Sequence, residues 1–378
     1  MRILWYNWRD IRHPEAGGAE VLTHEISARL TKKYHHEVTL FTSRFPGASW
    51  SECVDGINVI REGGRYSVYE KAKAHYKKNR NSYDIIIDEI NVKPFLTPKY
   101  VKKEKPVLAL IHQISPEQFT YELPFPLSFL GRYYLEKKWL SYYKDIPTAT
   151  VSHSTKSELE KLGLRNLFLV PEGLNIRPLT SLPVKETVPT IIFIGRLKKH
   201  KLPHHAIQAF VLIKKEVPTT RLWVIGDGYM REELKALKVK DTEFYGRVSD
   251  AQKYELLSRA HLVLMPGIRE GWGLVVTEAN AMGTPVVAYN IPGLRDSVSN
   301  GNSGILVKEN TPSGLASSAI SLLRDNVLLQ KLSLNALAFS KQFSWERSAD
   351  IFNQIIDKLI SGSLQEKEGR KGIRDFAG

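Results

Sequence analysis

Short apolar runs that alternate with longer helix-like segments constrain the fold of this 378-residue chain most strongly. The runs are rich in β-branched residues and bounded by turn or charged residues, which is typical of buried strands. In the first half they cover residues 3–6, 38–42, 57–60, 85–87, 107–111, 149–152 and 168–170. Helical candidates such as residues 19–33 lie between them, with apolar residues at helical spacing. This alternation predicts a parallel sheet with helices on both faces.

A second series of the same kind follows a stretch that interrupts the rhythm. Residues 178–189 contain three prolines and no strong pattern, which is typical of a linker. The later strands are expected at residues 190–194, 222–225, 243–245, 262–265 and 285–288. The sequence therefore predicts the α/β class, with two doubly wound Rossmann-like domains that face each other across a cleft.

The predicted domain bounds follow from these two series. A first Rossmann-like domain covers residues 1–178, a linker covers 179–189, and a second Rossmann-like domain covers 190–343. A helix at 344–360 is expected to pack back on the first domain. The last segment, 361–378, is polar and is predicted to be a mobile tail.

The composition narrows the class of protein. The single Cys53 excludes a disulfide framework and any multi-cysteine metal site. No apolar run approaches the roughly 18 to 20 residues of a membrane-spanning helix. The first strand reaches Asn7 and Arg9 too soon for a secretory signal. We therefore expect a cytoplasmic protein, with peripheral attachment to the inner face of the cell membrane as an open alternative.

The net charge of +14 leaves several kinds of partner open. Nucleic acid, anionic membrane surfaces and phosphorylated substrates all suit a basic protein. No zinc-finger spacing and no RNA-binding signature is visible, so we predict no nucleic-acid partner. Residues 71–105 carry ten basic and four acidic side chains, and any charged docking face is expected there.

Glycine-rich and charged segments follow the predicted strands, where doubly wound domains bind ligands. Gly17 and Gly18 follow the first strand and open a helix, whose dipole favours an anion. An ordinary strand-to-helix turn is the alternative. Gly195, Arg196 and Lys201 follow the first strand of the second domain. The two cations can bind a diphosphate from both sides. When such a basic segment is considered alone, a solvent-exposed loop is the more common interpretation.

The most specific segment follows the strand at 262–265. It comprises Glu270, Gly271, Trp272, Gly273 and Leu274, and the helix that they open carries Glu278. Glycines at a helix start expose successive N–H groups, which form a nest for an anion. Eight residues of helix span about 12 Å. The two carboxylates can therefore accept hydrogen bonds from sugar and ribose hydroxyls while the N–H groups between them hold phosphate. A capping and a surface glutamate form the alternative interpretation.

With these motifs in order after the expected strands, the chain resembles glycosyltransferase family 4, which has the GT-B fold. The resemblance covers about residues 1–360. It rests on Gly17-Gly18-Ala19-Glu20, Gly195-Arg196 with Lys201, Gly226-Asp227-Gly228, Phe244-Tyr245-Gly246-Arg247-Val248, the pair Glu270 and Glu278, and Gly283-Thr284-Pro285. The opening Trp5-Tyr6-Asn7-Trp8-Arg9-Asp10 is similar to a subgroup seen in archaea and some bacteria.

The resemblance implies a role for each matching segment of the second domain. Arg196 and Lys201 would neutralise the diphosphate of a nucleotide sugar. Glu278 would bind the ribose, and Glu270 would bind hydroxyls of the donor sugar. The backbone around Gly246, Arg247 and Val248 would face the base.

In the first domain, the resemblance implies that Gly18 lets its loop close on the donor. His112 follows the strand at 107–111 and matches the family histidine that contacts the transferred sugar. Without the resemblance, a single histidine after a strand would be interpreted as structural. The catalytic residues expected on this basis are His112, Arg196, Lys201 and Glu270.

The implied reaction moves a hexose-type sugar to an acceptor with retention of anomeric configuration by a front-face mechanism. Such catalysis depends on positioning and on stabilising the leaving phosphate, so it requires no protein nucleophile. No Asp-x-Asp motif is present, and we expect no metal and no further cofactor. Two positions depart from the family pattern: Glu172 stands where Asn is common, and Leu202 replaces the usual Gly.

The acceptor is expected to be lipid-linked or a glycan. Residues 119–144 interleave aromatic, aliphatic and basic side chains, which suits a membrane interface with anionic lipids. A core helix with a basic exposed face is the alternative. Two other functions stay open: another GT-B enzyme such as a sugar-nucleotide epimerase, and a basic nucleic-acid-binding protein. The sequence does not reveal the donor sugar, its base or the linkage.

Overall fold

Contacts divide the chain into two compact units. The computed structural model describes residues 1–101, 104–114, 117, 120–121 and 124–374. The first unit contains Met1–Ile114, Tyr133–Gly173 and Ser344–Gly378, and the second contains Ser115–Arg132 and Leu174–Phe343. The predicted first domain included residues 115–132, whereas the contacts group the described part of this segment, residues 117, 120–121 and 124–132, with the second unit.

The first unit is built on an eight-stranded sheet with the order β3-β4-β2-β1-β5-β6-β7-β8. All neighbouring strands are parallel except the edge pair of β3 and β4. The strands are β1 (Arg2–Tyr6), β2 (Glu37–Thr42), β3 (Ser51–Val54), β4 (Ile57–Arg61), β5 (Ile85–Ile90), β6 (Val107–Ile111), β7 (Thr148–Thr150) and β8 (Leu167–Leu169). The helical elements are α1 (Gly18–Tyr34), α2 (Val68–Asn79), η1 (Arg80–Ser82), α3 (Pro98–Val101), α6 (Glu136–Leu140), η3 (Ser141–Tyr143), α7 (His153–Lys161) and α15 (Trp345–Arg374).

The second unit is built on a six-stranded parallel sheet with the order β11-β10-β9-β12-β13-β14. The strands are β9 (Thr190–Ile194), β10 (Arg221–Ile225), β11 (Thr242–Gly246), β12 (Leu262–Met265), β13 (Val286–Ala288) and β14 (Gly304–Leu306). Its helical elements are η4 (Lys199–Lys201), α8 (Pro203–Glu216), α9 (Arg231–Ala236), α10 (Asp250–Arg259), α11 (Leu274–Ala281), α12 (Leu294–Ser297), α13 (Pro312–Arg324) and α14 (Asn326–Ser340). The short α5 (Leu127–Leu130) belongs to it as well, and the π-helical η2 (Gly131–Leu135) continues from α5 into the first unit.

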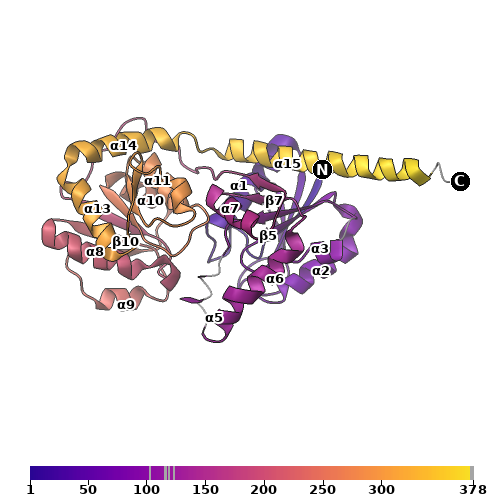
Figure 1. The fold of residues 1–378 in the computed structure, drawn as a ribbon, viewed down its shortest axis with the longest axis horizontal. Coiled ribbons are helices and arrows are strands. Elements are labelled where there is room, and N and C mark those ends of the chain that lie inside the picture. Colours follow the sequence, from indigo (N-terminus) through magenta and orange to yellow (C-terminus); the bar gives the residue numbers. More distant parts are fainter. Residues whose placement is uncertain (102–103, 115–116, 118–119, 122–123, 375–378) are drawn as a thin grey trace. The chain divides into compact units, whose positions relative to one another are not determined.

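The central strands of both sheets are apolar because helices cover both of their faces (Figure 1). Strand β1 is buried from Ile3 to Tyr6, and strand β12 from Leu262 to Met265. The predicted fold class, two doubly wound Rossmann-like sheets, is confirmed. The loops that follow β1, β6, β9 and β12 at the carboxyl edges of the sheets carry the glycine-rich and charged segments singled out above.

Helix α15 packs on α1 of the first unit. The rings of Trp5 and Phe352 stack at 5.0 Å, and an Arg29 Nη2 atom lies 2.8 Å from Oε1 of Glu346. The helix continues to Arg374, through most of the segment from residue 361 that the sequence predicts to be a mobile tail.

A buried ion pair fixes the loop that follows β1. The Arg61 side chain at the end of β4 is fully buried, and its Nε and Nη2 atoms donate to the two Asp10 carboxylate oxygens at 2.7 and 3.0 Å. Its Nη1 atom lies 2.6 Å from Oε1 of Glu52 on β3. The three side chains tie the edge of the sheet to the loop that leads into α1.

Substitution Arg61→Met is expected to lower the free energy of unfolding by about 3–5 kcal/mol, because it leaves the buried Asp10 carboxylate without its cation. Urea unfolding measures the change. Arg2→Met is the control, since Arg2 pairs with Asp84 at 2.8 Å on the exposed surface and its loss should have little effect. Equal effects of the two substitutions would contradict the importance of the buried pair.

Candidate nucleotide-sugar site

The loop after β9 is held in place by close backbone contacts with the loop after β10. The amide of Leu197 donates to the carbonyl of Asp227 at 2.9 Å. Gly226 and Gly228 have φ values of +128° and +159°, and a Cβ atom on them would lie 2.0 and 2.4 Å from carbonyl oxygens of Gly195 and Leu197. The Gly226-Asp227-Gly228 motif therefore supports the loop that presents Arg196 and Lys201.

The loop after β12 ends at the N-terminus of helix α11. Gly273 is the N-cap residue with φ +89°, a left-handed conformation that glycine adopts without strain. The amides of Leu274 and Val275 find no acceptor among the described residues, as expected in the first turn of a helix. On the same loop, Arg269 Nε donates to Glu117 Oε2 at 2.9 Å. The helix start thus offers free N–H groups on an anchored loop.

The structure brings Lys201 and Glu270 together. The Nζ atom of Lys201 lies 2.5 Å from Oε1 of Glu270, and the two side chains are 21% and 10% exposed. Arg196 is half-buried, and no ion pair involving it is found within the described part of the chain. Two cations and one carboxylate therefore lie on the two loops of the second unit where the sequence predicts a diphosphate and a sugar.

Glu278 lies one to two turns into α11 and is paired with helix α10. Its Oε1 atom accepts from Lys253 Nζ at 2.8 Å and from the Tyr254 hydroxyl at 3.4 Å. Burial works against the charged form of Lys253, but the Glu278 carboxylate raises the pKa of that lysine above its ordinary value. Sequence analysis missed Lys253 and Tyr254, because nothing in their spacing indicates which helix packs beside Glu278.

The predicted base-facing segment follows β11. Arg247 is exposed, and the half-buried Val248 packs against the core of the second unit. Ser249 caps α10 by accepting from the Gln252 amide at 3.3 Å, so this segment leads directly into the helix that carries Lys253. The structure places these residues on the same unit as Glu278.

In the first unit, His112 follows β6 and is held by Glu89. Its Nε2 atom lies 2.9 Å from Oε1 of Glu89, whose Oε2 accepts from Trp5 Nε1 at 2.7 Å and from the Thr23 hydroxyl. Burial opposes protonation of the imidazole, but the hydrogen bond and charge of Glu89 raise the pKa of His112 above its ordinary value. Glu89 lies two residues beyond the predicted strand at 85–87, and only the fold reveals that it contacts His112.

Gly17 and Gly18 begin α1 beside a buried carboxylate. The Gly17 amide donates to Oε2 of Glu20 at 2.6 Å, and Oε1 of Glu20 accepts from Arg9 Nε at 2.9 Å. Part of the helix N-terminus is therefore already neutralised by Glu20. Gly17, Gly18 and His112 lie in the first unit, whereas all other predicted site residues lie in the second.

Glu172 departs from the family pattern and is buried near His112. It is 3% exposed, and its Oε2 atom has no hydrogen-bond partner among the described residues. Burial raises the pKa of this carboxyl group to about 8, against the opposing charge of His112. The side chain is therefore mostly uncharged at neutral pH.

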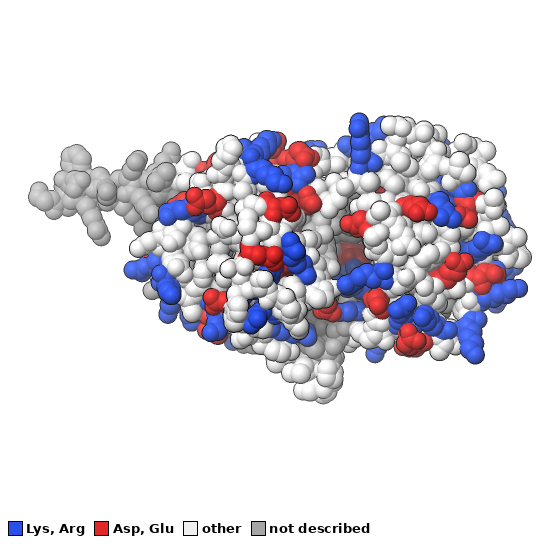
Figure 2. Space-filling view, turned by 180° about the vertical axis from the view of Figure 1, so that it is seen from behind, with Lys and Arg blue, Asp and Glu red and all other residues white. Residues whose placement is uncertain are grey.

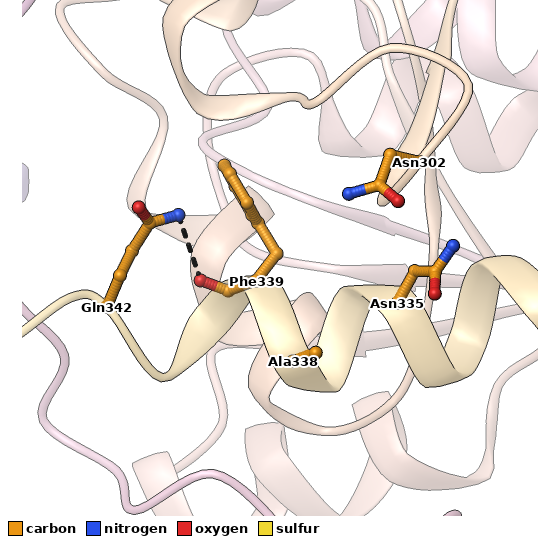
Figure 3. A pocket seen from close by; sticks show the side chains of 5 residues that line it. All are labelled: Asn302, Asn335, Ala338, Phe339 and Gln342. Atoms are coloured by element: carbon orange, nitrogen blue, oxygen red, sulfur yellow. Dashed lines mark hydrogen bonds between the residues drawn. The ribbon is translucent and has the colours of Figure 1, made fainter.

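A groove on the second unit contains none of the predicted site residues. It is lined by Asn302, Asn335, Ala338, Phe339 and Gln342 along helix α14, and Gln342 Nε2 donates to the Phe339 carbonyl at 3.0 Å (Figure 3). Among the described residues, no group of three or more His, Cys, Asp or Glu side chains is arranged to hold a metal ion. The described helices include none with the length and apolarity needed to span a bilayer.

Replacing Glu172 with Gln should flatten the pH dependence of stability. The unfolded chain keeps the Glu172 proton only up to its ordinary pKa of 4.5, whereas the folded protein keeps it to about 8. The folded state therefore binds more protons in this interval, and the free energy of unfolding falls as the pH rises from 4.5 to 8.

Urea unfolding at several pH values between these limits measures the slope. Glu172→Gln should remove a loss on the order of a few kcal/mol across the interval. Glu104→Gln is the control, because that exposed carboxylate lies 3.9 Å from Arg80. Identical slopes for the wild type and Glu172→Gln would contradict the assignment of a neutral buried carboxyl group.

Part of the chain is similar to proteins of a known family. Residues 180–338 match the family model for glycosyl transferases group 1. Glycogen synthase of Mycobacterium tuberculosis is 29% identical over 240 residues, which cover 61% of this chain and 58% of that protein. The matched region thus spans little more than half of this relative.

Solved structures extend the likeness to nearly the whole fold. Sucrose-phosphate synthase from Thermosynechococcus elongatus has a TM-score of 0.80 at 19% identity, covering 96% of this chain and 99% of that one. HepE of Anabaena, solved with UDP and glucose, has a TM-score of 0.70 at 19% identity, covering 96% and 100%. Together these findings show the GT-B fold, and residues 180–338 carry the pattern of the group 1 glycosyl transferases.

Proposed function

We propose that this protein is a retaining glycosyltransferase. It moves a hexose-type sugar from a nucleotide diphosphate sugar to a lipid-linked or glycan acceptor. The observation that carries the proposal is the arrangement on the second unit, where Lys201 contacts Glu270 beside the open N-terminus of α11 and Glu278 lies on the same helix. HepE, which shares the fold, was solved with UDP and glucose, and this supports a nucleotide-sugar donor.

The donor diphosphate would lie between the two carboxylates. Arg196, Lys201 and the amides of Leu274 and Val275 supply positive charge for its oxygens. The diphosphate would compete with Glu270 for the Lys201 ammonium group. Glu270 would then accept hydrogen bonds from sugar hydroxyls, and Glu278 from the ribose.

The chemical step breaks the bond between the anomeric carbon and the donor phosphate oxygen, which keeps the electron pair. An acceptor hydroxyl oxygen bonds to the same face of that carbon, and its proton passes to the departing phosphate. Arg196, Lys201 and the helix N-terminus stabilise the charge that develops on the phosphate. The proposed reaction therefore uses protein cations in place of a metal ion and needs no further cofactor.

The first unit would contribute His112 and the Gly17-Gly18 turn. Because Glu89 holds Nε2 of His112 at 2.9 Å and raises its pKa, the imidazole keeps a proton to donate. In the proposal, His112 donates to a hydroxyl of the transferred sugar, and Gly18 lets the turn approach the donor. The buried network behind His112 supports such a role because it fixes the ring orientation.

The acceptor would be reached at an anionic membrane surface. Residues 125–134 carry large apolar side chains in exposed positions, among them Phe125 at 83%, Phe129 at 59% and Tyr134 at 55%. Lys137 and Lys138 follow directly on α6 and are exposed. Exposed aromatic rings next to lysines favour the lipid interface over a buried core helix. The relative glycogen synthase leaves a soluble glycan as the other acceptor class.

A nucleic-acid-binding function finds less support. On the face shown in Figure 2, Lys and Arg side chains are interspersed with Asp and Glu rather than gathered in one stripe. Nucleic-acid-binding proteins concentrate basic residues along one surface. A sugar-nucleotide epimerase would share the fold, but it would form no glycosidic bond to an acceptor.

Substitutions Lys201→Ala and Glu278→Ala are expected to lower the transfer rate at least about 10²-fold, because each removes a charged side chain that is proposed to contact the donor. Mass spectrometry of the products from a panel of nucleotide sugars, supplied with lipid extracts, measures transfer. Lys199→Ala is the control, since Lys199 is exposed in the same short helix η4. Near-wild-type transfer by both variants, with folding intact, would refute these assignments.

Membrane binding is tested by co-sedimentation with anionic liposomes at low salt, where electrostatic attraction is strongest. The wild type should co-sediment, and the double substitution Phe125→Ser and Phe129→Ser should weaken binding roughly tenfold or more, because two apolar side chains no longer enter the interface. Tyr66→Ser is the control, since Tyr66 is 78% exposed in a different segment. No co-sedimentation of the wild type would count against a membrane surface.

A further inference from the structure

The two oxygens of the Glu278 carboxylate have different surroundings. Oε1 accepts from Lys253 at 2.8 Å and from Tyr254 at 3.4 Å. Oε2 has no partner in the part of the chain that the structure describes, and it is not among the buried unpaired atoms. Since the Glu278 side chain is 12% exposed, a ligand can reach Oε2. One oxygen is thus committed to the protein, and the other is open.

Lys253 is itself held firmly. Its side chain is 18% exposed, its Nζ atom also lies 3.0 Å from Oδ1 of Asp250, and its ammonium group lies 4.7 Å from the centre of the Tyr254 ring. The residue sits in the first turn of α10, where its amide donates to the Ser249 carbonyl at 2.8 Å. A lysine with two carboxylate partners and an aromatic contact loses little further freedom when a ligand binds beside it.

The pairing determines what Glu278 can recognise. An ionised carboxylate only accepts hydrogen bonds, whereas a protonated one also donates. The ammonium group of Lys253 fixes the Glu278 side chain through one oxygen. The remaining oxygen then suits a ligand with two adjacent hydroxyl donors, as in the ribose of a nucleotide.

We propose that Lys253 is a positioning residue that holds Glu278 so that its second carboxylate oxygen accepts from the ribose hydroxyls of a nucleoside diphosphate. The inference rests on the proposed function, because it requires a nucleotide on the second unit. Lys253 acts on the nucleotide through Glu278 and makes no contact with the reacting atoms. It therefore affects the affinity for ribonucleotides specifically.

Calorimetric titration of the full-length protein tests this inference. UDP and GDP are the probes, each compared with its 2′,3′-dideoxy form. Four proteins are titrated: wild type, Lys253→Met, Glu278→Gln and the double variant. Lys253→Arg is added as the conservative substitution. Arg259→Met is the matched control, because Arg259 lies on the same helix and pairs with Glu186 at 2.6 Å instead of with Glu278.

Lys253→Met is expected to weaken binding of the better ribonucleotide roughly tenfold or more, the effect of one charge-assisted hydrogen bond. The substitution should not change the affinity for the dideoxy form, and it should add nothing to Glu278→Gln. Lys253→Arg should restore most of the affinity, and Arg259→Met should bind like the wild type.

Two results would overturn the inference, and they are distinguishable. If Lys253→Met weakens the dideoxy and ribose forms equally, or weakens binding further in the Glu278→Gln background, Lys253 does not act through Glu278 and the ribose. The proposed function would survive that result. If the wild type binds neither UDP nor GDP, the proposed nucleotide site falls, and the inference falls with it. If Lys253→Met does not fold, the affinities of Lys253→Arg for the ribose and dideoxy forms are compared with those of the wild type instead.

Discussion

Glu270 precedes helix α11 and Glu278 lies within it, and each of these two carboxylates is paired with one lysine. Lys201 contacts Glu270 at 2.5 Å, and Lys253 contacts Glu278 at 2.8 Å. These pairs keep the two carboxylates close to the N-terminus of α11, which favours anions. Without its lysine, either carboxylate would repel a diphosphate bound there. The Lys201–Glu270 pair also joins the two loops of the second unit that precede α8 and α11.

The first unit uses buried polar contacts in the same way. Glu89 fixes His112, and Arg61 joins Asp10 so that the loop before α1 keeps its conformation. Such pairs are costly to bury unless every partner is satisfied. Glu172 is one exception, because its buried Oε2 has no partner among the residues that the structure describes, and burial raises the pKa of this carboxyl group to about 8. Rigid polar contacts behind a site favour accurate positioning of the groups in front of it.

The sequence predicted the strands that carry the motifs, because their buried runs are continuous. It missed β3 (Ser51–Val54), an edge strand with polar residues, and β14 (Gly304–Leu306), which has only three residues. Glu270 and Glu278 were predicted from glycine spacing, but Lys253 was not. The contact between Lys253 and Glu278 depends on how α10 packs beside α11, and the spacing of residues along the sequence does not reveal which helices pack together. The roles of the predicted residues in catalysis stay predictions.

The central claim is that the second unit binds a nucleoside diphosphate. The melting temperature of the wild-type protein, measured with increasing UDP, GDP or duplex DNA, tests it most directly. A ligand at 100 times its Kd stabilises the folded protein by about 2.7 kcal/mol, so one nucleotide should raise the melting temperature in proportion to the logarithm of its concentration. Stabilisation by DNA alone, with no response to either nucleotide, would contradict the account.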